Sequence, residues 1–564
     1  MNAAVDHYWL GSYPAGVPAE IDPGQYASLK QLIEECCARY ADRPAYSNFG
    51  RTLSYRQLER MSRAFGAWLQ QEARLKRGER IALMMPNVLQ YPVALFGALR
   101  AGLTVVNTNP LYTHRELEHQ LNDSGARAIV VYEQAAHLVQ ECLAETGLEH
   151  VIVTGVGDLL AFPRSALVNF VLRHVRKQVK RYILPDARRF TEVLEQGKWV
   201  DLAASGATLE DVAFLQYTGG TTGVAKGAML THRNMVANTL QADVWLGAFV
   251  AEPEKPRLIV GALPLYHIFA LTTIALLGMR SGDEVMLITN PRDMPGFVRE
   301  LKKRKVNVFY GVNTLYNSLM HAPGFEAIDF SALDSSVAGG MALQGAVAQR
   351  WRELTGCILA QGWGLTETSP CATMSPAGLD FNNSIGLPMP STEISIRDES
   401  GTALAVGGVG EICVRGPQVM RGYWNRPDET AKVMLEGGWL RTGDIGRMDP
   451  AGFVYIEDRK KDMILVSGFN VYPNEVEGVL AQHPGVLEVA AVAQADERSG
   501  EVVAVFVVKR DPALTEAQLV EFARTELTGY KVPKHVYFRD ELPKTNVGKI
   551  LRRALRDELA KKAH

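Results

Sequence analysis

The spacing of apolar and polar residues predicts helices first and then a long alternation of strands and helices. Residues 28–75 carry apolar residues at helical spacing on two faces, which predicts a helical region. From residue 80 onward, short apolar runs of strand length alternate with segments of helical spacing. Strands are expected at residues 81–85, 104–107, 128–132, 284–288, 306–310 and 336–338, with helices at 91–101 and 115–123. Such alternation is typical of a doubly wound parallel α/β sheet, and its recurrence indicates two similar halves.

The last part of the chain has a different pattern. From about residue 386, turn residues and short strand-like runs predict a small β subdomain, and a charged stretch follows at 458–462. Beyond it the chain has an α+β pattern, with helices expected at 476–480 and 514–527 and strands at 486–493 and 502–509. We therefore predict an N-terminal domain of residues 1–458 and a small C-terminal domain of residues 459–564.

Residues 164–184 combine apolar and basic residues at helical spacing. The predicted helix has one apolar and one basic face, although Phe170 and Leu184 fall on the basic side. The apolar face comprises Leu167, Val168, Val171, Leu172, Val175, Val179, Tyr182 and Ile183, and the basic face comprises Arg173, Arg176, Lys177, Lys180 and Arg181. A basic amphipathic helix can lie in the interface of an anionic membrane, and it can equally pack its apolar face on its own domain. The sequence leaves both interpretations open.

Composition and charge change this picture little. The 564 residues exceed what one hydrophobic core supports, so several subdomains are expected. A hydrophobic content of 47%, 22% charged residues and a net charge of −2 describe an ordinary globular protein and give no reason to expect nucleic-acid binding. The six scattered cysteines predict reduced thiols in a cytosolic protein. We expect neither a signal peptide nor a membrane-spanning helix.

Residues 217–232 are rich in groups that suit phosphate oxygens. Glycines allow close backbone approach, threonines supply hydroxyls and Lys226 supplies a positive charge. The small residues are Thr218, Gly219, Gly220, Thr221, Thr222 and Gly223. The Walker A pattern is not met, because Ala225 precedes the lysine and Gly227 follows it, so no hydroxyl after the lysine can bind magnesium. A polyphosphate site is the main interpretation, and a flexible Gly/Thr loop is the alternative.

Four further stretches contain groups that could bind a nucleotide. They are Ala338-Gly339-Gly340-Met341-Ala342, Gly362-Trp363-Gly364-Leu365-Thr366-Glu367-Thr368, Trp439-Leu440-Arg441-Thr442-Gly443-Asp444 and Pro543-Lys544-Thr545-Asn546-Val547-Gly548-Lys549. A ring between glycines can stack on a purine, a carboxylate such as Glu367 can bind magnesium, and Asp444 could accept both ribose hydroxyls. Taken singly, each stretch also has a structural explanation: a packed tryptophan, an aspartate in a turn, or a solvated lysine.

Together and in this order, these five stretches resemble the acyl-adenylate-forming superfamily of acyl-CoA synthetases, luciferases and peptide-synthetase adenylation domains. The resemblance extends from Tyr55 to Lys549. Residues 438–446, 458–464 and 467–477 look like the fatty acyl-CoA synthetase signature, and the chain is most similar to bacterial long-chain fatty-acid–CoA ligases. The resemblance implies an α/β fold: a large N-terminal domain of two doubly wound subdomains plus a small β-barrel-like subdomain, and a small mobile α+β C-terminal domain.

The resemblance implies two half-reactions that use ATP, Mg²⁺ and coenzyme A. A fatty-acid carboxylate attacks the α-phosphate of ATP to give acyl-AMP and pyrophosphate, and the thiol of coenzyme A then displaces AMP. By this resemblance residues 218–226 bind the β- and γ-phosphates, Thr218 and Glu367 bind Mg²⁺, and Lys549 reaches the reacting carboxylate and α-phosphate. The implied nucleotide-binding set also contains Gly339, Gly340, Met341, Gln361, Gly362, Trp363, Gly364, Thr366, Asp444, Ile456 and Arg459. Among these, Gly339, Gly340 and Trp363 form the adenine slot, and Asp444 and Arg459 bind the ribose.

The remaining implied roles concern the acyl group and the second step. His267 falls where the family has a ring beside the carboxylate, although a core histidine is the alternative. The implied acyl-binding residues are His267, Leu271, Tyr310, Gly311, Val312 and Gly340. Lys461 falls at the hinge of the family, where rotation would withdraw Lys549 and present Ser467, Gly468 and Phe469 to the thioester step.

Three residues depart from the family pattern. Ala225 stands where many members have proline, which predicts a less rigid loop. Trp363 replaces the commoner tyrosine and should preserve stacking. Leu271 stands where one bacterial subgroup has a tryptophan gate for the acyl tunnel, so gating by tryptophan is not expected here.

We therefore predict a long-chain acyl-CoA synthetase that is cytoplasmic and, by analogy with the family, a homodimer. Peripheral contact with the inner face of the cell membrane through residues 164–184 is the open alternative for that segment. Within the superfamily, a ligase for medium-chain or aromatic acids, or one that loads a carrier protein, is an alternative. A non-catalytic nucleotide- or lipid-binding protein is the alternative from another class, and the presence of Lys549, Glu367 and Asp444 speaks against it.

Overall fold

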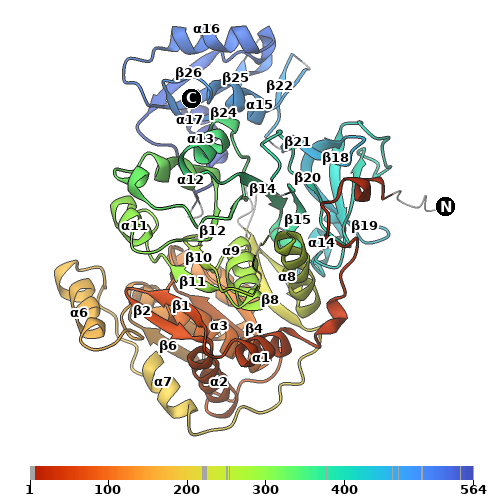
Figure 1. Ribbon diagram of the computed structural model, residues 1–564. Helices are drawn as coiled ribbons and strands as arrows, with labels where there is room; N and C mark the ends of the chain where they lie inside the picture. Colours follow the sequence, from red (N-terminus) through yellow and green to blue (C-terminus); the bar gives the residue numbers. More distant parts are fainter. Residues whose placement is uncertain are drawn as a thin grey trace.

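The strands of the protein form four sheets (Figure 1). The structure is a computed structural model that describes residues 7–218, 225–248, 250, 252, 254–376, 378–459, 462–467, 469–496, 499–545 and 548–562. Two large sheets and one small sheet come from the chain before residue 460, and the fourth sheet comes from the chain after it.

The first large sheet has nine strands and is parallel through its middle. Their order is β16 (Leu387–Pro388), β15 (Cys371–Met374), β14 (Leu359–Gly364), β13 (Ser335–Ala338), β12 (Val308–Gly311), β10 (Leu258–Gly261), β11 (Glu284–Leu287), β1 (Pro44–Asn48) and β2 (Arg51–Ser54). The pairs from β14 across to β1 are parallel, and β2, β15 and β16 are antiparallel to their neighbours.

The second large sheet has seven strands, and only its last pair is antiparallel. Their order is β7 (Arg188–Arg189), β6 (His150–Thr154), β5 (Ala126–Tyr132), β3 (Arg80–Met84), β4 (Thr104–Asn107), β8 (Val212–Thr218) and β9 (Lys226–Thr231). Strands β8 and β9 form an antiparallel hairpin at the edge of the sheet, and the other pairs are parallel. The predicted strands at 81–85, 104–107, 128–132, 284–288, 306–310 and 336–338 are confirmed to within two residues.

The two smaller sheets are mostly antiparallel. The third sheet contains β17 (Glu393–Arg397), β18 (Gly410–Arg415), β20 (Trp439–Met448), β19 (Met434–Leu435) and β21 (Val454–Arg459). The fourth contains β23 (Phe469–Val471), β22 (Ile464–Val466), β25 (Gly500–Lys509), β24 (Val486–Asp496) and β26 (His535–Arg539). The predicted architecture of two doubly wound α/β subdomains, a small β subdomain and an α+β C-terminal unit is confirmed.

The α-helices lie between and around these sheets. In the described residues they are α1 (Leu29–Arg39), α2 (Tyr55–Gln71), α3 (Gln90–Arg100), α4 (His114–Ser124), α5 (Ala136–Cys142), α6 (Arg164–Phe170), α7 (Phe190–Gly197), α8 (His232–Gly247), α9 (Ile268–Ala270), α10 (Leu277–Ser281), α11 (Met294–Leu301), α12 (Asn313–Met320), α13 (Gly345–Thr355), α14 (Pro427–Val433), α15 (Pro473–Leu480), α16 (Glu516–Glu526) and α17 (Arg552–Lys562). No helix in these ranges is long and apolar enough to cross a membrane.

Close contact between α2 and α3 shows how the central core is packed. Every residue of α3 is buried. A Cβ atom on Gly66 would lie 2.7 Å from the carbonyl oxygen of Gly97, and one on Gly97 would lie 2.7 Å from the carbonyl oxygen of Ser62. Because only glycine leaves room for such an approach, these two positions set the distance between the helices.

The C-terminal unit, blue in Figure 1, lies at the end of the molecule opposite α2 and α7 and next to α12 and α13. The amide of Asn317 on α12 donates a hydrogen bond of 3.1 Å to the carbonyl oxygen of Leu487. The unit has two buried clusters of its own, one on each face of the β24–β25 pair. The C-terminal unit thus has a separate core, and a hydrogen bond between polar groups links it to α12.

The helical prediction for residues 28–75 is wrong in its middle. Helices α1 and α2 are present, but the β1–β2 hairpin separates them. Phe49 and Gly50 have φ values of 47° and 77°, and such left-handed backbone produces the tight turn. Strand β1 pairs with β11, a strand more than two hundred residues away, so tertiary pairing outweighs the local helical pattern.

The predicted helix at 164–184 is too long. The helix comprises α6 and a π-helical turn at Val171–Val175, and Lys177, with φ 50°, ends it. Arg173, predicted on the solvated basic face, binds Glu133 instead, with its Nε 2.8 Å from a carboxylate oxygen. Glu133 is buried and also binds Arg189, so the segment is fastened to the second large sheet by an ion pair.

Replacing Glu133 by glutamine should destabilise the protein at neutral pH. Burial alone would raise the pKa of Glu133, but hydrogen bonds from Arg173 and Arg189 lower it overall. Loss of this charged acceptor should cost about 1.5–3 kcal/mol. Because the folded-state pKa lies below the unfolded value, this stabilisation is complete above about pH 5 and is lost as the pH falls through the folded-state pKa. Differential scanning calorimetry should show the difference between wild type and Glu133→Gln shrinking on acidification.

The matched control is Glu141→Gln, which removes an exposed carboxylate from α5. This variant should unfold within about 0.5 kcal/mol of wild type. Equal unfolding temperatures of Glu133→Gln and wild type at pH 7 would show that the ion pair does not anchor the segment.

Candidate active site

The described residues of the predicted phosphate-binding stretch belong to two paired antiparallel strands. Strand β8 ends at Thr218, β9 begins at Lys226, and these two residues face each other in the antiparallel pair. Residues 219–224, which include the predicted Gly219, Gly220, Thr221, Thr222 and Gly223, lie outside the described residues. The ring of His119 lies with Nε2 3.2 Å from the carbonyl oxygen of Ala225. The hairpin therefore places the hydroxyl of Thr218 and the ammonium of Lys226 at the same end of the sheet.

Residues 421–424 pair with the outer edge of this hairpin. The amide nitrogens of Met229 and Trp424 donate to the carbonyl oxygens of Gly422 and Gly227 at 2.9 and 2.8 Å. The amide nitrogen of Arg421 donates to the carbonyl oxygen of Met229 at 3.0 Å. A segment that leads into the third sheet thus extends the second large sheet by one short strand-like stretch.

Lys226 and Glu367 both contact Tyr423. The ammonium of Lys226 lies 2.7 Å from Oε2 of Glu429 and 4.7 Å from the centre of the Tyr423 ring. The hydroxyl of Tyr423 donates a hydrogen bond of 2.6 Å to Oε1 of Glu367. Burial and the neighbouring Glu367 carboxylate raise the pKa of Tyr423, so its hydroxyl stays a donor. The structure therefore brings together two residues that the sequence predicted, more than 140 positions apart.

Asp123, on α4, ties this cluster to the second large sheet. Its carboxylate accepts hydrogen bonds from the hydroxyl of Tyr217 at 2.7 Å and from the guanidinium of Arg426 at 2.8 Å. Its carbonyl oxygen accepts a bond of 3.0 Å from the indole nitrogen of Trp424. Tyr217 directly precedes Thr218, so the base of the hairpin has a fixed position.

The predicted adenine-slot residues lie at the ends of β13 and β14. Gly339 follows β13, and a Cβ atom there would lie 3.0 Å from the Phe269 ring and 3.2 Å from the carbonyl oxygen of Gly362. Gly340 has φ 76° and Gly364 lies so close to Pro370 that a Cβ atom would be 1.7 Å from its carbonyl oxygen. Both crowding and backbone conformation therefore require glycine here.

Trp363 and Asp444 contact each other directly. The indole nitrogen of Trp363, on β14, donates a hydrogen bond of 3.0 Å to Oδ2 of the buried Asp444, on β20. Asp444 is paired across the third sheet with Arg459, whose side chain lies outside the described part of the structure, and Ile456 is on the same strand, β21. One residue predicted for the adenine slot and one predicted for the ribose are thus in direct contact.

Gln361 on β14 has a polar atom that no described group satisfies. Its side chain is buried, and within the described residues its Oε1 accepts no hydrogen bond. Met341 and Thr366 flank this region, and Met341 lies near the hydroxyl of Thr314. A buried acceptor without a partner is costly, so such an atom is expected to receive a hydrogen bond from a ligand.

His267 and Lys549 interact electrostatically although they lie in different units of the chain. Nδ1 of His267 accepts a hydrogen bond of 3.3 Å from the backbone nitrogen of Phe269. Burial, and to a smaller extent the charge of Lys549, lower the pKa of His267 to about 4. The carbonyl oxygen of Gly548 accepts a hydrogen bond of 2.9 Å from the hydroxyl of Thr314 on α12, which holds the Lys549 loop against the larger part of the molecule.

Four of the predicted acyl-binding residues, Leu271, Tyr310, Gly311 and Val312, are buried, whereas Gly340 is exposed. Leu271 begins a π-helical turn at Leu271–Leu276, whose residues are all buried. Tyr310 lies at the end of β12 and packs edge-on against Phe269 with 6.3 Å between ring centres. Gly311 and Val312 continue the strand toward Thr314, and Gly311 faces the ring of Tyr316. These residues place apolar surface next to the predicted carboxylate position.

The hinge and thioester residues are described only in part. Lys461 and Gly468 lie outside the described residues. Ser467 has φ 51°, and its nitrogen donates to the carbonyl oxygen of Ser499 at 2.8 Å. Phe469 is exposed and stacks on Tyr530 with 5.0 Å between ring centres. Phe469 is thus available at the surface of the C-terminal unit.

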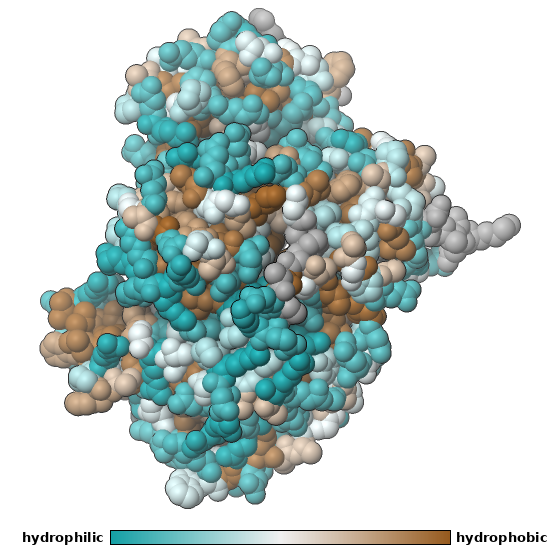
Figure 2. Space-filling view, in the orientation of Figure 1, coloured by the Kyte–Doolittle hydropathy of each residue, from teal (hydrophilic) through white to brown (hydrophobic). Residues whose placement is uncertain are grey.

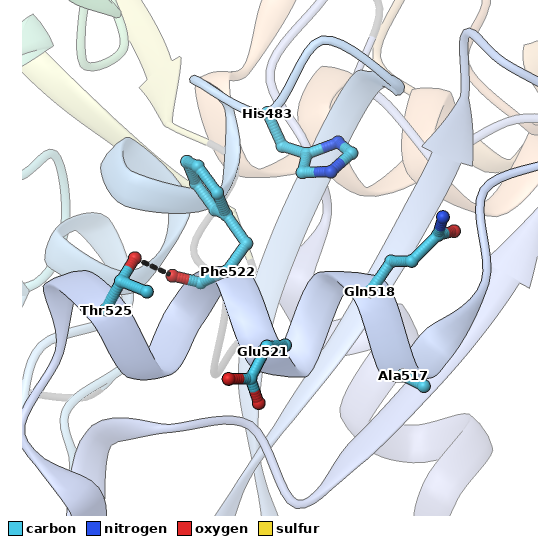
Figure 3. A pocket seen from close by; sticks show the side chains of 6 residues that line it. All are labelled: His483, Ala517, Gln518, Glu521, Phe522 and Thr525. Atoms are coloured by element: carbon cyan, nitrogen blue, oxygen red, sulfur yellow. Dashed lines mark hydrogen bonds between the residues drawn. The ribbon is translucent and has the colours of Figure 1, made fainter.

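Figure 3 shows the residues that line an open depression on the C-terminal unit. It is lined by His483 and by Ala517, Gln518, Glu521, Phe522 and Thr525 of α16. His483 packs edge-on against Phe522 with 5.1 Å between ring centres. None of the residues predicted to bind nucleotide or acid lines this depression, so it is separate from the candidate active site.

The sequence did not identify Tyr423, Glu429 or Asp123. These residues belong to no phosphate-binding pattern, and a tyrosine or an acidic residue at a helix start has many ordinary structural roles. The available signal was an aromatic pair, Tyr423-Trp424, after a glycine and ahead of Pro427 in a polar stretch.

Thr218 and Lys226 at one end of a hairpin on one α/β sheet, with Gly339, Gly340 and Gln361 at the strand ends of another, are typical of a site at which an enzyme binds a nucleotide. The chain belongs to the AMP-binding enzyme family, whose model matches residues 33–424. The model of the C-terminal domain of AMP-binding enzymes matches residues 475–549.

Similar proteins narrow this class further. The long-chain-fatty-acid–CoA ligase of Escherichia coli O157:H7 is 57% identical over 98% of this chain and 98% of that protein. The ligase of the same name from Bacillus subtilis (strain 168) is 38% identical, over 99% of each. Among solved structures, a benzoate CoA ligase from Burkholderia xenovorans LB400 has 28% identity and a TM-score of 0.79, over 93% of this chain and 99% of that one.

His267 should remain neutral throughout the physiological pH range. Its pKa of about 4 means that protonation begins only near pH 5, far below that of an ordinary histidine. NMR titration of histidine-labelled protein, with the resonance assigned by His267→Gln, should show no transition of this ring between pH 8 and about pH 5.5. Lys549→Ala should raise the pKa only in part, because burial is the larger cause. A midpoint near 6.5 in the wild-type protein would contradict this picture.

Proposed function

We propose that the protein converts long-chain fatty acids to acyl-CoA in two steps, through an acyl-AMP intermediate. The overall reaction consumes ATP, a fatty acid and coenzyme A and gives acyl-CoA, AMP and pyrophosphate. The observation that carries this proposal is 57% identity over nearly the full length to a long-chain-fatty-acid–CoA ligase, against 28% to a benzoate ligase of the same fold. The identity therefore favours long-chain over aromatic acids.

The nucleotide would lie along the strand ends of β13, β14 and β20. Gly339 and Gly340 leave room for the base, and the buried Oε1 of Gln361 is an acceptor suited to an exocyclic amino group such as that of adenine. Trp363 offers its ring to the base, and Asp444 lies beside it to accept ribose hydroxyls. The Trp363–Asp444 hydrogen bond would fix the angle between the two contacts.

The phosphates would lie at the hairpin. Lys226 supplies a positive charge, and the hydroxyl of Thr218 and the carboxylate of Glu367 are the hard oxygen ligands that Mg²⁺ prefers. The residues present thus fit Mg²⁺, which when bound neutralises charge on phosphate oxygens. Tyr423 orients the Glu367 carboxylate through its hydrogen bond of 2.6 Å.

His267 and Lys549 would act on the acid. Because Nδ1 of the neutral His267 accepts from the backbone, Nε2 carries the hydrogen and can donate to a carboxylate oxygen of the acid. Lys549 brings a positive charge to the carboxylate and the α-phosphate, where negative charge gathers in the transition state. The acyl chain would extend past Leu271 and Tyr310, and each buried CH₂ contributes roughly 0.8 kcal/mol.

The two steps would be separated by rotation of residues 459–564 about Lys461. The contacts of Gly548 with Thr314 and of Leu487 with Asn317 are the ones that such a rotation breaks. Lys549 would then leave the acid, and Ser467, Gly468 and Phe469 would approach the thioester. Single hydrogen bonds of this kind contribute little each, which suits a domain that must move in each cycle.

Lys549→Ala should abolish acyl-AMP formation while leaving thioester formation from supplied acyl-AMP and coenzyme A within about threefold of wild type. A positioned cation at a developing negative charge is worth about 10²–10³ in rate. Both half-reactions are measured separately, the first by pyrophosphate release for acids of increasing chain length. A preference for benzoates or short acids would refute the long-chain proposal, and equal loss of both steps would refute the role of Lys549.

The segment after β6 supports a second proposal, peripheral contact with an anionic membrane. Figure 2 shows hydrophobic residues gathered on the protruding α6 segment. Phe162, Leu167, Phe170 and Val175 are 85, 61, 56 and 64% exposed. Val168 and Leu172 pack on the core instead, so only part of the predicted apolar face is free to bind lipid.

Exposed basic residues lie beside this apolar surface. They are Arg176, Lys177, Lys180 and Arg181. Arg173 is exposed as well, but its guanidinium is bound to the buried Glu133. Apolar residues that insert into a bilayer and cations that bind anionic headgroups are the two features of an interfacial helix. We infer a cytoplasmic protein that contacts the inner face of the cell membrane through this segment. The family resemblance also implies a homodimer, which stays a prediction that a molar mass measured by light scattering can test.

Arg176→Glu with Lys177→Glu should weaken binding to phosphatidylserine-containing vesicles at least about tenfold, because each cation near the surface contributes about 1 kcal/mol. Co-sedimentation at physiological salt measures this. The matched control is Arg299→Glu with Lys302→Glu, two exposed cations at the end of α11. Unchanged binding of the first variant, or equal loss in both, would show that the segment does not contact membrane.

A further inference from the structure

The cation predicted to bind phosphates already has a carboxylate partner. Oε2 of Glu429 lies 2.7 Å from the ammonium of Lys226, and its other carboxylate oxygen binds Lys432. Hydrogen bonds and charge from Lys226 and Lys432 lower the pKa of Glu429 to about 2. Glu429 is therefore ionised at every pH at which the protein is active.

The backbone around Glu429 fixes this partner in place. Glu429 lies in the first turn of α14, which begins at Pro427 directly after the segment paired with β9. The nitrogen of Tyr423 donates to the hydroxyl of Thr430 at 2.9 Å, which ties the helix to that segment. Because the same segment also contacts the hairpin, the carboxylate and the ammonium are held by one connected piece of backbone.

The ion pair between Lys226 and Glu429 can affect ligand binding and can still be broken by a competing anion. The side chains of Lys226 and Glu429 are 27 and 33% exposed, so solvent screens their attraction. Ion pairs of this exposure contribute little, so losing one should change the affinity for a competing ligand by no more than roughly fivefold. A polyphosphate with Mg²⁺ offers Lys226 more negative charge than one carboxylate does.

We propose that Glu429 is an internal competitor for the β- and γ-phosphates: it neutralises Lys226 before the nucleotide arrives and is displaced when a polyphosphate binds. This inference rests on the proposed role of Lys226 in binding those phosphates. AMP has neither phosphate, so Glu429 competes with ATP and pyrophosphate but not with AMP. The pair thereby weakens retention of pyrophosphate, the first product, without weakening retention of the adenylate.

The test measures the affinities of Mg²⁺–ATP, Mg²⁺–pyrophosphate and AMP by calorimetry in the absence of fatty acid. Glu429→Gln should tighten ATP and pyrophosphate binding about two- to fivefold and leave AMP binding unchanged. Asp428→Asn is the matched control, because it removes the same charge from an exposed neighbour on the same helix that does not contact Lys226. The control should change each of the three affinities only slightly. The change should be smaller than the change in pyrophosphate affinity that Glu429→Gln causes.

A third variant, Lys226→Ala, separates this inference from the proposed phosphate role. Weaker ATP and pyrophosphate binding in Lys226→Ala, with no tightening in Glu429→Gln, would overturn only the competitor role. Unchanged ATP and pyrophosphate binding in Lys226→Ala would overturn the phosphate role itself. Weaker pyrophosphate binding in Glu429→Gln would also overturn the proposal, since it would mean that Glu429 positions Lys226 for its ligand. Combining Glu429→Gln with Lys226→Ala should give the affinities of Lys226→Ala alone.

Discussion

The backbone pairing of residues 421–424 with strand β9 is the constraint on which the candidate site depends. It joins the second large sheet, which provides Lys226, to the chain that leads into the third sheet, which provides Asp444. The nitrogen of Met420 donates to the carbonyl oxygen of Glu367, so the same segment also holds the proposed magnesium ligand. Backbone hydrogen bonds need no particular side chains. The side chains of Tyr423 and Glu429 can therefore contact Glu367 and Lys226 instead.

The residues of the candidate site belong to two parts of the molecule with separate buried cores. The nucleotide residues lie on or beside strands within one continuous buried core. Lys549 belongs to a unit with a separate core, which accepts hydrogen bonds from Thr314 and Asn317 on α12. In the proposed two-step reaction, the strand-borne surface would keep the adenylate while Lys549, on the separate unit, changes place.

The sequence predicted the strands of both large sheets because continuous apolar runs of strand length have few alternatives once they alternate with helices. It failed where distant residues decide local structure. The β1 strand forms because β11 pairs with it, and the basic helix ends early because Lys177 takes left-handed backbone while Arg173 turns to Glu133. The glycine, tryptophan and lysine stretches were recognised only together and in their order, because each alone also has a structural explanation. Glu429 was not, since its role depends on a contact across two hundred residues.

The hairpin also explains why the phosphate stretch lacks the hydroxyl of a Walker A loop. In that loop a helix follows the lysine, and its N-terminus contributes backbone nitrogens and a partial positive charge to the phosphates. Here a strand, β9, follows Lys226, and strands have almost no net dipole. Under the proposed function, positive charge would therefore come from side chains and metal: from Lys226 itself, and from an ion held by Thr218 and Glu367. In that proposal the magnesium ligands lie outside the residues that follow the lysine, where a strand stands in place of a helix.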